Sequence, residues 1–325
     1  MKYGMAYEGS KNKIAEWVID NLPESDVLID AFGGGGAITH CACLSGKYKT
    51  VVYNELNHLV YDTFRKAVNG EYRNENRWIS REQFYMLKDI DGYVALCFSF
   101  GNDMQSYAYS KDIEQAKMLI HQMICSDTQK ERRLAWRKLN RYLQENEIDL
   151  QKLTPMENLE RVERLAKLET MQHLINLDRF QSLEKLQRLK QLQSLENLER
   201  LQSLERLDRL QSLEGLDQGS LIMINKSYDQ IDIPEGAVVY CDIPYKDTGQ
   251  DYQSGFNHDA FYEWALNNKN TIVVSEYDMP SDFYLIAEKD HTTTKSAYGE
   301  NGKVVERLYS NKDIRPKQAT QLSLF

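Results

Sequence analysis

The sequence lacks the patterns that mark several classes of protein. Its five cysteines form no C-x-x-C pair, so we expect neither a disulfide framework nor a zinc ribbon, and a reducing cytoplasm fits best. Its six histidines form no H-x-E or H-E-x-x-H pattern, and we predict no metal site. No apolar run reaches the roughly 18 residues of a membrane span, and residues 1–10 lack the apolar core of a secretory signal.

An excess of positive charge is also missing. The 325 residues carry a formal net charge of −9, which argues against a protein that coats nucleic acid without sequence preference. This charge still permits a DNA enzyme with one local basic face. With 42% apolar residues the chain can bury a core, and its length predicts two or three compact units.

An internal repeat occupies residues 151–217. An apolar residue, usually leucine, stands at every third position from Leu153 to Leu216. An α-helix turns about 100° per residue, so a strict three-residue stripe circles the helix and keeps no single face dry. The composition, rich in Leu, Glu, Gln and Arg, nevertheless favours helix. Two alternatives therefore stay open, a solenoid, which we prefer, and broken helices. In either form we expect a spacer or interaction module.

Apolar strands alternate with helices on both sides of this repeat. Buried strands are predicted at residues 26–32, 50–54, 236–241, 271–275, 283–288 and 304–309, and helices near 37–44 and 258–267. This alternation predicts an α/β fold with a largely parallel sheet covered on both faces. We place a catalytic domain at residues 1–68 and 218–325, a helical DNA-binding insertion at 69–150 and the leucine-rich tract at 151–217.

A glycine-rich turn follows the first predicted strand, where residues 30–36 read Asp-Ala-Phe-Gly-Gly-Gly-Gly. Such a turn lets a ligand approach the backbone closely, and in doubly wound sheets it lies at the carboxyl ends of the strands. Glu55 ends the next strand, at the spacing where nucleotide folds hold ribose hydroxyls. This spacing favours an adenosine-containing cofactor, and a phosphate-binding turn is not favoured because neither G-x-G-x-x-G nor G-K-[ST] is present. A purely structural tight turn is the alternative.

Residues 242–245, Asp-Ile-Pro-Tyr, end the strand that follows the repeat. A carboxylate and a neighbouring backbone carbonyl can accept hydrogen bonds from an exocyclic amine, while a tyrosine ring can stack on the base that carries it. This arrangement favours recognition of a planar amine. A simple strand-terminating turn is the alternative.

A basic stretch precedes the repeat, with six cations against two acids in residues 127–144. Arg133, Arg137 and Arg141 recur every four residues, which places them on one side of a helix. Such faces commonly lie against phosphates, so we predict that Lys130, Arg133, Arg137 and Arg141 bind DNA. A merely solvated helix face is the alternative.

Together these motifs resemble the phage-like branch of the Dam-type N6-adenine DNA methyltransferases. Residues 7–11 (Tyr-Glu-Gly-Ser-Lys) resemble the family's N-terminal cofactor motif, and residues 54–57 (Asn-Glu-Leu-Asn) its ribose-binding motif. Residues 98–102 (Phe-Ser-Phe-Gly-Asn) resemble a segment of its central helical region. Two features depart from the family pattern: Ile243 replaces a proline, and the leucine-rich tract is an addition.

The resemblance implies a Rossmann-like sheet that binds S-adenosylmethionine and methylates the N6 amine of adenine in double-stranded DNA, without a metal. The implied cofactor residues are Tyr7, Lys11, Asp30, Phe32, Gly33, Gly34, Gly35 and Glu55, and the implied catalytic residues are Asp242, Ile243, Pro244 and Tyr245. The setting would be the cytoplasm of a bacterial or phage-infected cell, in a restriction–modification context.

Other functions stay open at this point. They are a catalytically inactive DNA-binding relative, and an N4-cytosine or RNA methyltransferase. The tail at residues 316–325, ending in Gln-Leu-Ser-Leu-Phe, is either a loose end or a docking peptide for a clamp-like partner.

Overall fold

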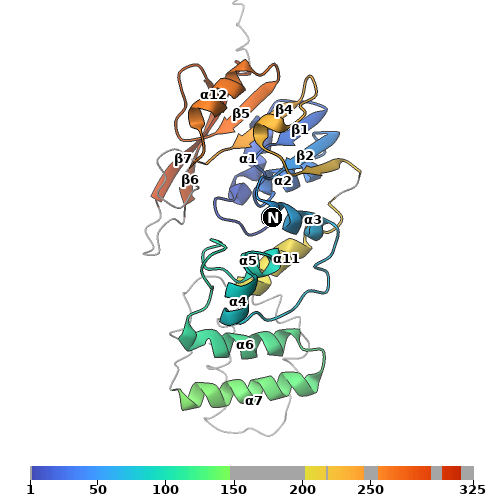
Figure 1. Cartoon of the computed structure of the whole chain (residues 1–325), viewed down its shortest axis with the longest axis vertical. Helices are drawn as coiled ribbons and strands as arrows, with labels where there is room; N and C mark the ends of the chain where they lie inside the picture. The colour runs from blue at the N-terminus through green and yellow to red at the C-terminus, as the bar shows by residue number, and fades with distance from the viewer. Residues whose placement is uncertain (1, 147–201, 217–218, 245–254, 294–301, 316–325) are drawn as a thin grey trace, which may run out of the picture. The chain divides into compact units, whose positions relative to one another are not determined.

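The computed structural model describes residues 2–146, 202–216, 219–244, 255–293 and 302–315 (Figure 1). The chain divides into two compact units. The first comprises Met1–Arg73 and Arg209–Phe325, and the second Asn74–Asp208. Most of the leucine-rich tract, Tyr245 and the predicted docking tail lie outside the described residues.

The first unit is built on a seven-stranded sheet in the order β3-β2-β1-β4-β5-β7-β6. Neighbouring strands from β3 to β5 are parallel, and β7 runs antiparallel to both β5 and β6. The strands are β1 (Val27–Asp30), β2 (Thr50–Asn54), β3 (Leu221–Ile224), β4 (Val238–Asp242), β5 (Thr271–Ser275), β6 (Tyr284–Thr293) and β7 (Gly302–Ser310). This sheet confirms the predicted α/β class.

The central strands are buried along their length because both faces of the sheet are covered. Every residue of β2 and β5 after the first is buried, and β4 is buried up to its last residue. Continuous apolar runs of this kind are typical of parallel strands, which is why the sequence located them. The sequence did not locate β3, a four-residue strand with only its first residue buried.

Short helices precede and connect these strands. They are α1 (Ala15–Asn21), α2 (Ala37–Ser45), α3 (His58–Val68) and α12 (His258–Asn267), with 3₁₀ turns at Lys11–Lys13 and Tyr228–Gln230. The side chains of Asn57 and Asn257 cap α3 and α12 by accepting hydrogen bonds from first-turn backbone N–H groups. The helix predictions near 37–44 and 258–267 are confirmed.

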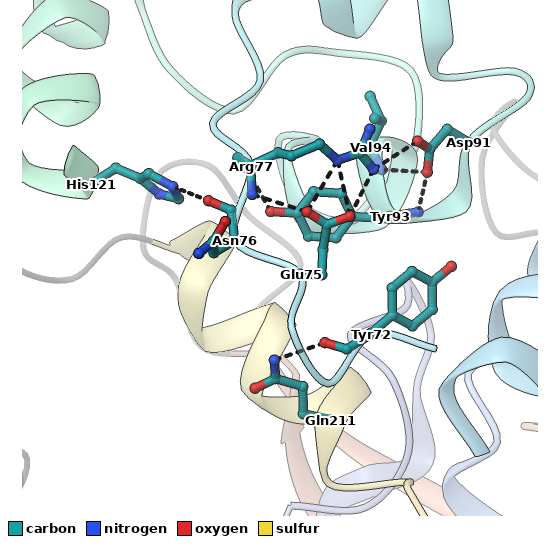
Figure 2. Close-up of polar contacts among 9 residues, drawn as sticks. All are labelled: Tyr72, Glu75, Asn76, Arg77, Asp91, Tyr93, Val94, His121 and Gln211. Carbon is teal, nitrogen blue, oxygen red and sulfur yellow. Dashed lines mark hydrogen bonds and ion pairs between the residues drawn. The ribbon is translucent and has the colours of Figure 1, made fainter. Parts of the chain in front are cut away.

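The second unit is helical, with α4 (Arg81–Leu87), α5 (Gly92–Cys97), α6 (Lys111–Cys125) and α7 (Gln129–Glu145). Helices α6 and α7 pack side by side (Figure 1), and the Tyr142 hydroxyl donates to the Asp112 carbonyl over 3.2 Å. Polar contacts also secure the segment that precedes α4. Arg77 binds Asp91, and His121 Nε2 lies 2.6 Å from the Asn76 carbonyl oxygen (Figure 2).

The described end of the leucine-rich tract is a helix, α11 (Gln202–Gln211), and not the preferred solenoid. A three-residue stripe drifts by about 60° per step on a helix, which is tolerable over ten residues. Leu207 and Leu210 are therefore both buried, while Leu204 is partly so. Two further leucines, Leu213 and Leu216, are buried in the turns that follow. The solenoid prediction for residues 153–201 lies outside the described residues.

Asn54 at the end of β2 links this strand to the ends of β1 and β3. Its buried amide donates to the carbonyls of Ala31 (2.8 Å) and Lys226 (3.0 Å) and accepts from the Lys226 N–H (3.0 Å). We expect Asn54→Ala to lower the free energy of unfolding by about 2–4 kcal/mol, because buried groups lose their partners. Urea denaturation measures this loss.

The matched control is Asn225→Ala. This exposed amide also donates to two carbonyls, those of Glu55 and Leu56. Water can take the place of the Asn225 amide at these carbonyls, so we expect the free energy of unfolding to fall by less than about 1 kcal/mol. Equal losses in the two variants would contradict the role of Asn54.

Candidate active site

Three carboxylates gather where neighbouring strands end. Asp30 ends β1, Glu55 follows β2, and Asp242 ends β4. β1 lies between β2 and β4 in the sheet, and Asp30 stands opposite Tyr53 on one side and Tyr240 on the other. The chain leaves β1 toward β2 and later returns to β4 on the other side, so this edge is the switch point where α/β sheets bind ligands.

Asp30 attaches helix α2 to the sheet. Its Oδ2 atom accepts from the backbone N–H of Thr39 (3.2 Å) and from the Thr39 hydroxyl (2.7 Å). Burial raises the pKa of Asp30 to about 7, and the charges of Asp242 and Glu55 add to this effect. The carboxyl therefore positions the helix that follows the glycine-rich turn.

The glycine-rich turn is closely packed against aromatic rings. A Cβ atom on Gly33 would lie 2.3 Å from the ring of Tyr53, which is fully buried. Gly36 has a φ of +70° and begins α2, a conformation that favours glycine. The Tyr53 hydroxyl donates to the Gly34 carbonyl over 2.7 Å, and the Tyr7 ring lies against Gly34. The turn thus has one defined shape.

Glu55 contacts this turn directly. One carboxylate oxygen accepts from the Gly34 N–H (2.7 Å), and the other accepts from the Asn57 N–H (2.7 Å). Burial raises the pKa of Glu55, and these backbone donors oppose that rise. The structure therefore brings together two of the groups that the sequence assigned to the cofactor.

A buried cation joins the last residue of β4 to strand β7. Lys11 Nζ lies 2.8 Å from Asp242 Oδ1 and 3.7 Å from Glu306 Oε1. The Ser275 hydroxyl also donates to Glu306. Lys11 and Glu306 are 9% and 2% exposed, whereas Asp242 is 22% exposed. The ammonium predicted to contact the cofactor therefore lies on the carboxylate predicted to contact the target amine.

Charge and burial compete at this cluster. Burial raises the pKa of Asp242 to about 6, against the lowering effect of the Lys11 charge. Burial likewise opposes the charge on Lys11, but Asp242 and Glu306 outweigh it and raise the pKa of the ammonium. Sequence reasoning missed Glu306, an acid within the predicted strand 304–309, because Arg307 beside it makes the pair look like ordinary surface charge.

The rest of the 242–245 turn is held by packing and one hydrogen bond. The Ile243 side chain is buried in the hydrophobic core beside the sheet, and the Pro244 carbonyl oxygen lies 2.9 Å from His258 Nε2. His258, the first residue of α12, was not predicted as a site residue. Tyr245 lies outside the described residues.

Phe32 lies in an aromatic cluster beside these groups. Its ring stacks on Tyr228 with centroids 5.5 Å apart, and it meets Phe256 and Phe261 edge to face. Phe32 and Tyr228 remain partly exposed, so the cluster offers flat apolar surface next to the carboxylates. Tyr228 was also missed, because it follows the unrecognised strand β3.

Comparison with known proteins agrees with this geometry. Residues 7–160 match the model of the D12 class N6 adenine-specific DNA methyltransferases. Over these residues the chain is similar to that family. The match confirms the resemblance to the Dam-type adenine methyltransferases, and the seven-stranded sheet is consistent with a Rossmann-like methyltransferase fold. No curated protein matches the chain.

The predicted basic helix is α7, in the second unit. Lys130, Arg133, Arg137 and Arg141 are exposed on it, while Ala135, Leu139 and Leu143 are buried. None of the four cations forms an ion pair with a residue that the structure describes. The predicted basic face is thus present as an exposed surface.

The segment resembling the family's central helical region forms a tight hairpin. An isolated bridge pairs Ser99 with Tyr107. The turn between them holds Asn102 and Met104 at φ values of 67° and 58°. Buried Arg206 donates to the carbonyls of Cys97 and Ser99. The hairpin base is therefore ordered by a residue from the leucine-rich tract.

Within the described ranges of the chain, no helix combines the length and hydrophobicity that crossing a membrane requires. Nor do three His, Cys, Asp or Glu side chains in these ranges gather so that they could hold a metal ion.

Because Lys11 is buried between two carboxylates, we expect Lys11→Met to lose stability in a way that depends on pH. Burial raises the pKa of Asp242 to about 6 even beside Lys11, and without Lys11 the charge that opposes this rise is gone. The folded-state pKa of Asp242 then lies above its unfolded value, so stability falls as the pH rises through it, since an ionised carboxylate stays buried without a cation. We expect the free energy of unfolding, measured by urea denaturation, to fall by about 3 kcal/mol or more at pH 8 and by distinctly less at pH 5.

Lys49→Met is the control. Lys49 pairs with Asp26 where both side chains are more than 70% exposed, so we expect a loss below about 1 kcal/mol at either pH. A Lys11→Met loss that does not change between pH 5 and pH 8 would contradict the buried-cation account.

Proposed function

We propose that the protein transfers the methyl group of S-adenosylmethionine to the N6 amine of adenine in double-stranded DNA. The observation that carries this proposal is the position of Asp242, half-buried at the end of β4, which pairs with β1, the strand that the glycine-rich turn follows. Similarity to the family over residues 7–160 supports the same chemistry.

The residues around the glycine-rich turn fit an adenosine-containing cofactor. The Glu55 carboxylate can accept from ribose hydroxyls, the close-packed turn leaves backbone accessible, and Phe32 with Tyr228 offers flat surface for a base. When bound, S-adenosylmethionine supplies a methyl group on a sulfonium leaving group. The proposed cofactor residues are Tyr7, Lys11, Asp30, Phe32, Gly33, Gly34, Gly35 and Glu55.

Two members of this set act through other groups. Asp30 binds Thr39 and so positions the start of α2. Lys11 binds Asp242 and so orients the carboxylate toward the amine. Their proposed contribution is to the geometry of the site, since both side chains are largely buried.

The target amine is a weak nucleophile because its lone pair is delocalised into the adenine ring. Hydrogen bonds from the amine to the Asp242 carboxylate and to the Ile243 carbonyl would localise that lone pair. Among the described contacts only Oδ1 of Asp242 is engaged, by Lys11, so Oδ2 can accept. An amine that has received the methyl group would have to lose one proton, and the Asp242 carboxylate would accept it.

Base flipping would deliver the adenine to this edge. Ile243 and Pro244 hold the turn through the core and through His258. Tyr245 is proposed to stack on the base, worth about 1–3 kcal/mol.

Asp242→Ala tests the proposal. We expect methyl incorporation into DNA to fall more than about 100-fold, while the dissociation constant for S-adenosylmethionine changes little. The parent rate should drop as the pH falls through about 6, because Asp242 must be ionised to accept the bond. Digesting the DNA identifies the product, and N4-methylcytosine would reject the N6-adenine assignment.

Asp26→Ala is the control, since this exposed carboxylate pairs only with Lys49 among the described ion pairs. Activity of Asp242→Ala within tenfold of the parent would remove Asp242 from the site. An inactive parent that still binds DNA specifically would favour the DNA-binding alternative.

The exposed basic face of α7 is proposed to contact DNA phosphates. Its four cations point away from the buried Ala135, Leu139 and Leu143. Exposed cations on one side of a helix gain binding energy mainly by releasing counterions from the phosphates. This face would supply affinity, and base recognition would come from other residues.

Reversing charge at Arg133, Arg137 and Arg141 to Glu tests this face. Each lost phosphate contact should reduce the slope of log affinity against log salt by about 0.9. The control reverses three exposed cations of the first unit, Lys49, Lys269 and Arg315, so the net charge change is equal. An identical salt slope in the two triple variants would show that α7 is merely solvated.

A further inference from the structure

The N-terminal segment lies directly against the glycine-rich turn. The Met5 N–H donates to the Gly35 carbonyl over 2.7 Å. Gly4 has a φ of +65°, and a Cβ atom there would lie 2.4 Å from the Gly35 oxygen. The two stretches of backbone therefore touch without intervening side chains, so movement of one displaces the other.

One guanidinium holds this segment in place. Arg209 Nε donates to the Gly4 carbonyl (3.0 Å), and its Nη2 donates to the carbonyls of Tyr3 (2.9 Å) and Met5 (2.6 Å). Three successive carbonyls thus converge on one planar cation. Only arginine combines several N–H donors in a rigid fork, so no other side chain reproduces this geometry.

A histidine holds the opposite side of the same segment. The Gly4 N–H donates to His40 Nδ1 over 3.1 Å. Burial lowers the pKa of His40 to about 4, and the Arg209 charge adds to this effect. The imidazole is therefore neutral near pH 7, which leaves Nδ1 able to accept. Residues 3–5 are fixed by Arg209, by His40 and by the turn itself.

Arg209 is itself anchored within the first unit. The next residue, Leu210, is 1% exposed, and Leu213 is fully buried. Gln211 Nε2 donates to the carbonyls of Tyr72 (2.9 Å; Figure 2) and Arg73 (3.2 Å). The end of α11 thus presents Arg209 from a rigid base.

We infer that Arg209 is a positioning residue for the glycine-rich cofactor turn, which makes the last triplets of the leucine-rich tract part of the methyltransferase site. This inference rests on the proposed function, since it takes the turn to bind S-adenosylmethionine. Arg209 would then have a specific role in the site, whereas the repeat pattern predicts only a spacer or interaction module.

Arg209→Met, Arg209→Lys and the exposed control Arg315→Met test the inference in the full chain. Calorimetry with S-adenosylmethionine is run where circular dichroism shows each variant folded. We expect Arg209→Met to raise the dissociation constant about tenfold or more, because a displaced turn binds poorly. Arg209→Lys should bind S-adenosylmethionine more tightly than Arg209→Met, and Arg315→Met should bind it as the parent does. The KM of Arg209→Met for DNA should stay within about twofold of the parent value.

Hydrogen exchange separates positioning from general destabilisation. We expect faster exchange at the Met5 amide and in residues 33–36 of Arg209→Lys, with α12 unchanged. Equal acceleration in α12, or an unchanged cofactor affinity in folded Arg209→Met, would overturn the inference. If Arg209→Met does not fold, Arg209→Lys carries both measurements.

Failure of the proposed function has a different signature. A parent protein that binds no S-adenosylmethionine would reject the cofactor assignment. The exchange measurement would then still decide whether Arg209 holds the turn.

Discussion

The burial of Lys11 between two carboxylates is the constraint on which the proposed site depends. A cation at 9% exposure is stable only with close anionic partners, and Asp242 and Glu306 supply them at 2.8 and 3.7 Å. These residues come from the N-terminus, β4 and β7, so folding must bring three distant stretches together before the charges are compensated. The same requirement fixes the Asp242 carboxylate at the end of β4. The proposed chemistry thus uses a group whose orientation the fold already determines.

The N-terminal segment connects this ion cluster to the glycine-rich turn. Met5 binds Gly35, Tyr7 lies over Gly34, and Lys11 binds Asp242. One short stretch of chain therefore touches both the turn proposed for the cofactor and the carboxylate proposed for the target amine. The relative position of these two halves of the site is set by backbone contacts and one buried cation, which tolerate little movement.

The sequence predicted the parts of the site that depend on local patterns. Buried strands are continuous apolar runs, and Glu55 follows the glycines at a recognisable spacing, so both were located. Glu306, His258 and Arg209 were missed because each acts on a residue far away in the chain: Lys11, Pro244 and Tyr3–Met5. The preference for a solenoid was wrong for residues 202–211, because the argument from the three-residue stripe assumes a long helix. Ten residues are too few for the drift to expose the leucines.

The helical form of α11, the described end of the repeat, has a consequence for its polar residues. In this helix leucine occupies the first position of each triplet, and the third position drifts around the helix at the same rate. Ser203, Arg206 and Arg209 are successive third positions, and each has a specific partner. Ser203 binds the Tyr109 hydroxyl, Arg206 the carbonyls of Cys97 and Ser99, and Arg209 those of Tyr3, Gly4 and Met5. Buried polar groups need such partners. Near the end of the tract, therefore, the identity of the third residue is determined by what it contacts, and triplets that look interchangeable in sequence differ in their structural roles.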